Sequence, residues 1–142
     1  MKADILTEKH RLGLGGVAIG TAFEPLTDGD SYEVLQKAWD LGIRYYDTSP
    51  WYGLTKSERR FGNYLHGQNR EDFVLSTKVG RLFVEVPEDE VPPTMWQDPL
   101  HYDFEHNYTA DAIKRSIEES LERLRLDYID IVYVHDLSED QV

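Results

Sequence analysis

Four short apolar runs, separated by helical stretches, constrain the fold of this chain more than any other feature. The runs are rich in β-branched and aromatic residues, as strands are, and they span residues 12–19, 43–46, 73–77 and 128–134. Because short strands that alternate with helices favour a parallel sheet with helices packed outside it, the expected fold class is α/β. The chain holds about four strand-helix units, and it lacks the helix after the fourth strand.

The first two segments between the strands are expected to be helices. One follows the cap-forming residues 28–31 and ends at Gly42, and the other spans residues 56–65 after a cap at Thr55 or Ser57. Helical spacing of the apolar residues supports the first of them, at Val34, Leu35, Ala38 and Leu41.

A third helix is expected after Thr109, a residue type that commonly caps helices. Its apolar residues line one face, at Ile113, Ile117, Leu121 and Leu124. Residues 80–108, by contrast, show no period and contain several prolines. They are expected to form a long irregular loop, a kind of segment that is usually functional or mobile.

Polar side chains follow three of the strands directly. Asp47, Lys78 and His135 each come at the carboxyl end of an apolar run, and Tyr52 lies in the loop just after Asp47. In α/β barrels the carboxyl ends of the strands form the face on which active sites are built, with residues contributed by several strands. The four side chains are therefore expected to meet at one rim of the sheet.

These four groups suit proton transfer to a carbonyl oxygen. A phenol ordinarily ionises only near pH 10, so Tyr52 needs help to act as an acid at neutral pH. An adjacent Lys78 ammonium favours the phenolate, and Asp47 keeps that ammonium charged and in place. A neutral His135 can hold the same carbonyl oxygen. Since side chains supply no hydride, the chemistry requires a nicotinamide cofactor.

Each residue taken alone also has an ordinary structural interpretation. An aspartate after a strand often caps a helix, and a lysine at a strand end is usually solvated. A tyrosine beside a tryptophan usually packs, and a buried histidine usually only forms hydrogen bonds. The occurrence of all four at successive strand ends favours the catalytic interpretation over four coincidences.

Three separated motifs carry a resemblance to a known family. They are GIRYYDTSPWYG at residues 42–53, LSTK at residues 75–78, and the stretch 117–136 that joins the last helix to the histidine strand. Together they resemble the aldo-keto reductase superfamily over essentially the whole chain from Leu12. The resemblance implies that the fold is the first half of a (β/α)8 TIM barrel, with Asp47, Tyr52, Lys78 and His135 as its catalytic residues.

Two further stretches are similar to one branch of that superfamily. STKVGRL at residues 76–82 and HYDF at residues 101–104 resemble the aldose 1-dehydrogenases, which include the L-fucose and D-threo-aldose dehydrogenases, and also pyridoxal 4-dehydrogenase. The resemblance implies an NAD- or NADP-dependent oxidoreductase that acts on a small carbonyl or on a sugar hemiacetal.

The same resemblance implies binding roles for further residues. Gly20, Thr21 and Ala22, in the turn after the first strand, would approach the nicotinamide ribose together with Asp47. Two tryptophans, Trp51 and Trp96, would form a wall of the substrate pocket. Ordinary core packing is the alternative interpretation of both tryptophans.

The length of the chain departs from the family pattern. A complete barrel needs roughly 250 residues, whereas this chain has 142 and ends just after the fourth strand. Residues 1–142 are therefore expected to be the N-terminal portion of a single barrel domain, incomplete at the C-terminus and without most of the cofactor contacts. Three explanations of this short length stay open. The chain is part of a longer protein, it is a half-barrel that associates with a second copy or another partner, or it is an inactive relict.

Composition excludes several other classes. The chain has no cysteine, so disulfides and thiolate catalysis are excluded. A formal charge of −12, from 27 acidic and 15 basic residues, disfavours nucleic-acid binding. No apolar run approaches the roughly 20 residues of a membrane span, and no signal peptide is visible, so a cytoplasmic protein is expected.

Three rival functions stay open at this point. A non-catalytic binding module is one, because barrel folds serve many purposes, and an inactive barrel fragment without a complete cofactor site is another. A metal hydrolase fits less well, since His101, His106 and His135 lack a recognised ligand spacing, and no metal is expected.

Overall fold

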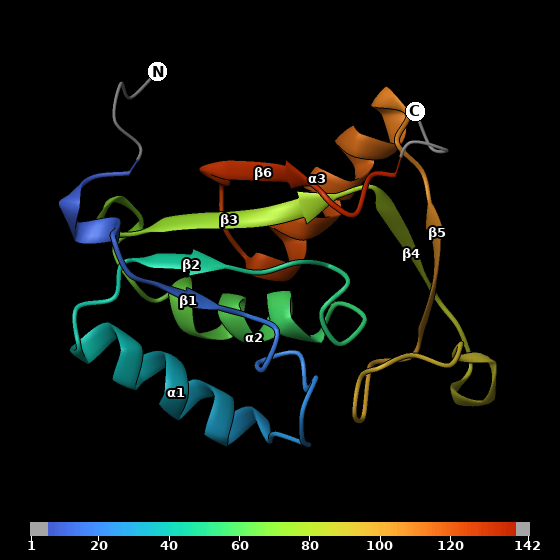
Figure 1. Ribbon diagram of the computed structural model, residues 1–142, viewed down its shortest axis with the longest axis horizontal. Coiled ribbons are helices and arrows are strands. Elements are labelled where there is room, and N and C mark those ends of the chain that lie inside the picture. Colours follow the sequence, from blue (N-terminus) through green and yellow to red (C-terminus); the bar gives the residue numbers. More distant parts are fainter. Residues whose placement is uncertain (1–5, 139–142) are drawn as a thin grey trace.

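The computed structural model describes residues 6–138, which contain a parallel sheet of four strands (Figure 1). The strands lie in the order β1 (Gly13–Gly15), β2 (Tyr45–Asp47), β3 (Val74–Val79) and β6 (Ile131–Val134). Every neighbouring pair is parallel. The predicted α/β class and parallel sheet are confirmed, although the first strand is much shorter than the apolar run 12–19 that predicted it.

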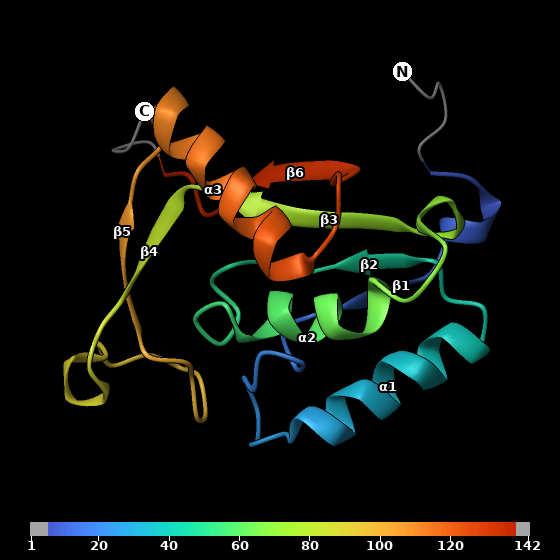
Figure 2. The same ribbon diagram turned by 180° about the vertical axis from the view of Figure 1, so that it is seen from behind.

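Three helices pack on this sheet: α1 (Asp28–Asp40), α2 (Lys56–Leu65) and α3 (Ala110–Leu124). Seen from behind, α2 and α3 stand in front of the strands, so the helices cover one face (Figure 2). Residues from α1, α2, β2 and β3 form the core between the layers, among them Leu35, Tyr46, Phe61, Tyr64 and Leu75. No helix within residues 6–138 is both long and apolar enough to cross a membrane.

Tyr46 shows how a polar group is accommodated in the core. Its ring is fully buried and meets Phe61 and Phe73 edge-on, at centroid distances of 6.0 and 6.2 Å. Its hydroxyl donates to the Ile43 carbonyl at 2.9 Å, so the buried phenol keeps a partner. Burial raises the pKa of Tyr46 to about 12, and this tyrosine stays neutral in the folded protein.

The helix starts differ in detail from the sequence prediction. The cap of α1 is Thr27, one residue before the predicted segment, and its hydroxyl accepts from the Asp30 amide at 3.1 Å. Helix α2 has the predicted bounds, and Thr55, one of the two predicted caps, holds its N-cap position. Its side chain makes no capping hydrogen bond, and its φ of 76° is left-handed. Ser57, the other predicted cap, lies inside the helix and donates to the Gly16 carbonyl at 3.0 Å.

The buried face of α3 is only partly the predicted one: Leu124 is fully buried, as predicted, but the other three predicted residues are not. Its most buried residues are small, apart from the last: Ala112, Ser116, Ser120 and Leu124. The predicted face of Ile113, Ile117 and Leu121 is only half-buried. At its last turn α3 lies very close to α2, because a Cβ at Gly62 would lie 2.6 Å from the Arg123 carbonyl oxygen. In α1, similarly, Leu41 is 71% exposed while Leu35 is buried.

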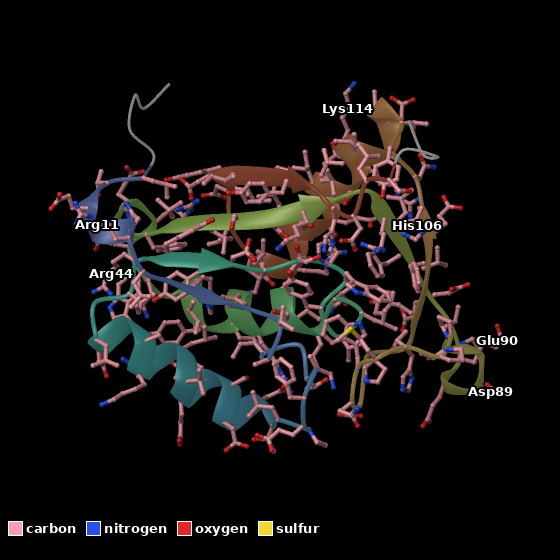
Figure 3. The ribbon with its side chains drawn as sticks, viewed as in Figure 1. Arg11, Arg44, Asp89, Glu90, His106 and Lys114 are labelled. Atoms are coloured by element: carbon pink, nitrogen blue, oxygen red, sulfur yellow. The ribbon has the colours of Figure 1, made fainter. Side chains whose placement is uncertain are left out.

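A hairpin replaces the predicted loop over residues 80–108. Strand β4 (Arg81–Glu85) pairs antiparallel with β5 (Tyr102–His106), so the prediction of an irregular segment was wrong there. Strand β5 alternates aromatic and acidic residues, a period of two that indicates a strand, but the proline-containing connection conceals its distant partner. Asp89 and Glu90 lie at the far end of the hairpin, while His106 lies near the sheet (Figure 3).

Gly80 redirects the chain from the sheet into this hairpin. It has a φ of 117°, a conformation that residues with a side chain rarely adopt. A Cβ at this position would also collide with the ring of Tyr108. The turn therefore requires glycine, and it brings β4 back over the carboxyl ends of the parallel strands, where the arrowheads of Figure 1 point.

Candidate active site

The carboxyl ends of β2, β3 and β6 bring the four predicted catalytic residues together. Asp47 ends β2, Lys78 lies near the end of β3, and His135 directly follows β6. Ser76 stands opposite Asp47 in the register of neighbouring strands. The predicted meeting of side chains at one rim of the sheet is thus what the structure contains.

Asp47 and Lys78 form a short ion pair. The Lys78 ammonium donates to Asp47 Oδ2 at 2.7 Å and to the Thr48 carbonyl at 2.9 Å. Ser76 donates to the other carboxylate oxygen, Oδ1, at 2.6 Å. Because the lysine side chain is only 13% exposed, the carboxylate compensates a charge that has little access to water.

Tyr52 lies over this pair. The Lys78 ammonium nitrogen is 4.7 Å from the centroid of the Tyr52 ring, within the range of a cation–π contact. The ring is 9% exposed and meets the His135 ring edge-on, with 5.9 Å between centroids. Gly20 supports it from below, since a Cβ there would lie 2.7 Å from the Tyr52 carbonyl carbon. The tyrosine is therefore enclosed by the ammonium, the imidazole and the first turn.

His135 is held on both its backbone and its ring. Its amide donates to the Val79 carbonyl at 2.9 Å. Its Nδ1 lies 3.2 Å from the Ser49 hydroxyl and 3.1 Å from a terminal nitrogen of Arg81. Burial lowers the pKa of His135 to about 4, and the cations of Arg81 and Lys78 act in the same direction against nearby carboxylates. His135 is therefore neutral at physiological pH.

Arg81 is the site residue that the sequence interpretation missed. It opens β4, contacts His135, and donates to Asp136 Oδ2 at 2.8 Å. Its guanidinium carbon also lies 4.9 Å from the centre of the Trp51 ring. Arg81 lies in the segment that was predicted to be irregular. A strand predicted directly after Gly80 would have placed Arg81 near the ends of the parallel strands and so made it a candidate site residue.

The predicted cofactor turn lies beside Tyr52, but its side chains face inward. Thr21 is fully buried, with a left-handed φ of 69°, and its hydroxyl is hydrogen-bonded to the Gln97 carbonyl. Gly20 is buried against Tyr52. Ala22 is half-buried and packs against the cluster that contains Tyr52 and Trp96. The backbone of Thr21 has protein partners as well: its amide donates to the Ala18 carbonyl at 2.9 Å, and its carbonyl accepts from the Gln97 amide at 2.8 Å.

Both predicted substrate-wall tryptophans lie next to Tyr52. Trp96 is buried, with its ring centroid 5.7 Å from that of Tyr52, and its indole nitrogen has no hydrogen-bond partner within residues 6–138. Trp51 is half-buried and meets Trp96 and Phe104 at 5.7 and 4.7 Å. The hairpin and these two rings form one aromatic cluster along the side of the site.

Two of the four predicted residues, Lys78 and His135, border a narrow crevice rather than a wide cavity. Ser49, Trp51, Lys78, Arg81 and His135 are among the residues that line it. A wider cavity of about 530 Å³ lies elsewhere, between the start of α1, helix α2 and the hairpin connection. We assign the chemistry to the crevice because the wider cavity contains none of the four predicted residues. Within residues 6–138, no three histidine, aspartate or glutamate side chains are grouped so as to hold a metal ion.

Comparison with known proteins agrees with this geometry. The family model described as "Aldo/keto reductase family" matches residues 11–142, and so includes all four site residues. The chain belongs to the aldo/keto reductase family. The resemblance noted in the sequence motifs is therefore confirmed, and the barrel of that family accounts for the parallel strands and outer helices.

Individual relatives are similar over most of this chain. It is 44% identical over 129 residues to a D-threo-aldose 1-dehydrogenase of a Pseudomonas species, covering 88% of this chain and 39% of that one. It is 36% identical over 135 residues to a pyridoxal 4-dehydrogenase of Microbacterium luteolum, covering 89% and 39%. An aldo-keto reductase structure from Pseudomonas aeruginosa matches with a TM-score of 0.66 at 37% identity, covering 90% and 43%. The chain thus spans about two fifths of the length of these relatives.

Proposed function

We propose that the protein is an NAD(P)-dependent oxidoreductase that interconverts a small carbonyl or sugar hemiacetal and its reduced or oxidised partner. One observation supports this above all: the Asp47–Lys78 ion pair lies beneath the Tyr52 ring, with a neutral His135 at its edge. Because the chain spans only part of its relatives, the proposal concerns the activity of the protein in which this segment functions.

In this proposal Tyr52 is the general acid and base. The Lys78 ammonium, held by Asp47, stabilises negative charge that develops on the phenol as its proton leaves for a carbonyl oxygen. In the oxidative direction Tyr52 accepts the proton of a hydroxyl group. Neutral His135 donates a hydrogen bond to the same oxygen and orients it. The aromatic cluster of Trp51, Trp96 and Phe83 excludes water from one side of the reaction.

The site residues fit a nicotinamide cofactor. A phenol, an ammonium and an imidazole can move protons but cannot carry hydride, so NAD or NADP would supply the hydride when bound. Asp47, whose side chain is 30% exposed beside Lys78, would face it. The 20–22 turn would lie beside it, although the three amides of that turn already donate to carbonyls of residues 16–18. Relatives support either cofactor: an Escherichia coli methylglyoxal reductase, 31% identical, is named as NADH-specific, and a Schizosaccharomyces pombe aldo-keto reductase, 30% identical, carries NADP(+) in its name.

The substrate class follows from the names of the most similar relatives. One is named a D-threo-aldose 1-dehydrogenase and another a pyridoxal 4-dehydrogenase, so their printed substrates are an aldose and pyridoxal. The crevice beside Lys78 and His135 is too narrow to hold a sugar in this structure, so the proposed substrate class rests on the names of these relatives. A cytoplasmic location, closure of the barrel by further chain or a second copy, and the absence of nucleic-acid partners stay predictions from composition and length.

A direct assay tests the proposal. The intact purified protein is mixed with NAD⁺ or NADP⁺ and a panel of aldoses and pyridoxal, and the absorbance of reduced nicotinamide is followed. Turnover that requires both cofactor and sugar or aldehyde is the expected result. If the folded protein binds neither cofactor and turns over none of the panel, the oxidoreductase proposal fails, and a non-catalytic binding module becomes the better explanation.

A further inference from the structure

Arg81 occupies an unusual position for an arginine. Its side chain is only 10% exposed, and its Nε is buried with no hydrogen-bond partner within residues 6–138. Its two terminal nitrogens reach different groups, His135 Nδ1 at 3.1 Å and Asp136 Oδ2 at 2.8 Å. The guanidinium also lies against the Trp51 ring. Such enclosure fixes the direction in which its N–H groups point.

The contact with His135 determines where the imidazole carries its proton. A guanidinium offers donors only, so the ring nitrogen that faces it must act as an acceptor. His135 Nδ1 is therefore without a proton, and the neutral ring carries its hydrogen on Nε2. The Ser49 hydroxyl is consistent with this assignment: it accepts from the Trp51 amide at 3.1 Å, which leaves its own hydrogen free to point at Nδ1.

We propose that Arg81 is a positioning residue that fixes His135 as the neutral tautomer with its proton on Nε2. The inference rests on the proposed function, in which His135 holds a carbonyl oxygen. Nε2 lies 3.6 Å from Asp136 Oδ2, beyond hydrogen-bond distance, so its N–H remains available to a substrate oxygen. An Nδ1–H tautomer would instead turn a lone pair toward the substrate and lose that hydrogen bond.

Charged groups reach His135 from every element around it. Lys78 comes from β3, Asp47 from β2, Arg81 from β4 and Asp136 from its own segment. Arg81 acts twice in this set, since it repels a proton on the imidazole directly and also holds the adjacent Asp136 carboxylate. Loss of Arg81 would expose His135 to an uncompensated carboxylate and would favour both the imidazolium and the other tautomer.

Long-range ¹H–¹⁵N spectra of the intact ¹⁵N-labelled protein test the proposal, because they distinguish a protonated ring nitrogen from an unprotonated one without any need for activity. The His135 signals are identified by their loss in His135→Asn. Wild-type protein is expected to show protonated Nε2 and unprotonated Nδ1 from pH 5 to 8. A wild-type spectrum with Nδ1 protonated in this range overturns the proposal even if no variant can be purified.

Arg81→Met is the decisive variant. It is expected to shift the His135 titration upward, towards the ordinary histidine value, and to populate the Nδ1–H form. In turnover assays kcat should fall about tenfold with a smaller change in KM, and the acid limb of the pH profile should move upward. Spectra and an acid limb that match wild type would contradict the proposal.

Two control variants separate this role from general damage. Arg59→Met removes another arginine that contacts the hairpin, since Arg59 donates to the Tyr102 hydroxyl at 2.8 Å, and it should leave the His135 signals unchanged. Ser49→Ala removes the second donor to Nδ1 and should retain protonated Nε2, because Arg81 remains. Loss of that tautomer in Ser49→Ala would assign the role to Ser49 and overturn the proposal. Failure of the proposed function would appear separately, as absence of turnover in wild type.

Discussion

Replacement of Glu58 by glutamine is expected to destabilise the protein strongly, although Glu58 touches none of the four site residues. Glu58 is fully buried at the start of α2. Its Oε2 accepts from Arg123 Nε of α3 at 2.6 Å, and its Oε1 accepts from the Thr77 hydroxyl of β3 at 2.6 Å. One carboxylate thus joins two helices to the strand that carries Lys78.

The magnitude follows from what the substitution leaves behind. The Arg123 side chain is only 9% exposed, so a neutral amide in place of the Glu58 carboxylate would leave its cation with only the longer ion pair to Glu119, at 3.8 Å. Breaking one side of a buried pair costs about 3–5 kcal/mol. With a urea m-value of about 1–3 kcal/mol/M, the midpoint of unfolding should fall by roughly 1–5 M. The hydrogen bond to Thr77 can persist in Glu58→Gln, so the loss reports mainly on the lost Glu58–Arg123 ion pair.

Urea unfolding followed by circular dichroism measures this effect. Arg123→Met combined with Glu58→Gln removes both charges and should be at least about 1 kcal/mol more stable than Glu58→Gln alone. Glu8→Gln is the matched control, since Glu8 pairs with Arg11 on the surface with both side chains mostly exposed, and its midpoint should not change. A Glu58→Gln midpoint equal to that of wild type would refute the buried-network reasoning.

Two further predictions concern the site. Because the pKa of His135 is about 4 in the folded protein and near 6.5 when unfolded, the neutral form contributes stability that is complete above pH 6.5 and is lost as pH falls towards 4. The loss is roughly 3 kcal/mol, and His135→Asn should flatten that part of a plot of urea midpoint against pH; an unchanged slope would contradict the assignment. Gly80→Ala should cost about 2–4 kcal/mol in urea unfolding, since it combines a φ of 117° with a collision against Tyr108, and a loss below about 0.5 kcal/mol would mean that the turn differs from the one described.

The sequence predicted what local patterns determine. Apolar runs located β2, β3 and β6, and the bounds of α2 were predicted without error. Asp47, Lys78 and His135 could be placed on one rim because the carboxyl ends of parallel strands share an edge. Tyr52 follows from the short distance along the chain between it and Asp47.

Features that depend on distant partners were not predictable in the same way. The β4–β5 hairpin pairs Arg81 with His106 across a long connection that contains prolines, and so its first strand resembled a loop. The buried residues of α3 include alanine and serines in place of the isoleucines that the helical period indicated, and the close approach of its last turn to Gly62 of α2 is a contact between elements that the helix's own sequence does not contain. The role of Arg81 depends on its contact with His135, which is 54 residues away along the chain. The sequence around either residue does not reveal that contact.

The most direct measurement of the acid–base assignment compares Tyr52→Phe with Tyr102→Phe in the intact protein. Both substitutions remove one hydroxyl from the same aromatic cluster, but the Tyr102 hydroxyl bonds only to Arg59 among the described residues. Tyr52→Phe should lower kcat about 10²–10⁴-fold with nicotinamide binding nearly unchanged, while Tyr102→Phe keeps wild-type turnover. Turnover by Tyr52→Phe at the wild-type rate would contradict the assignment of Tyr52 as the proton donor.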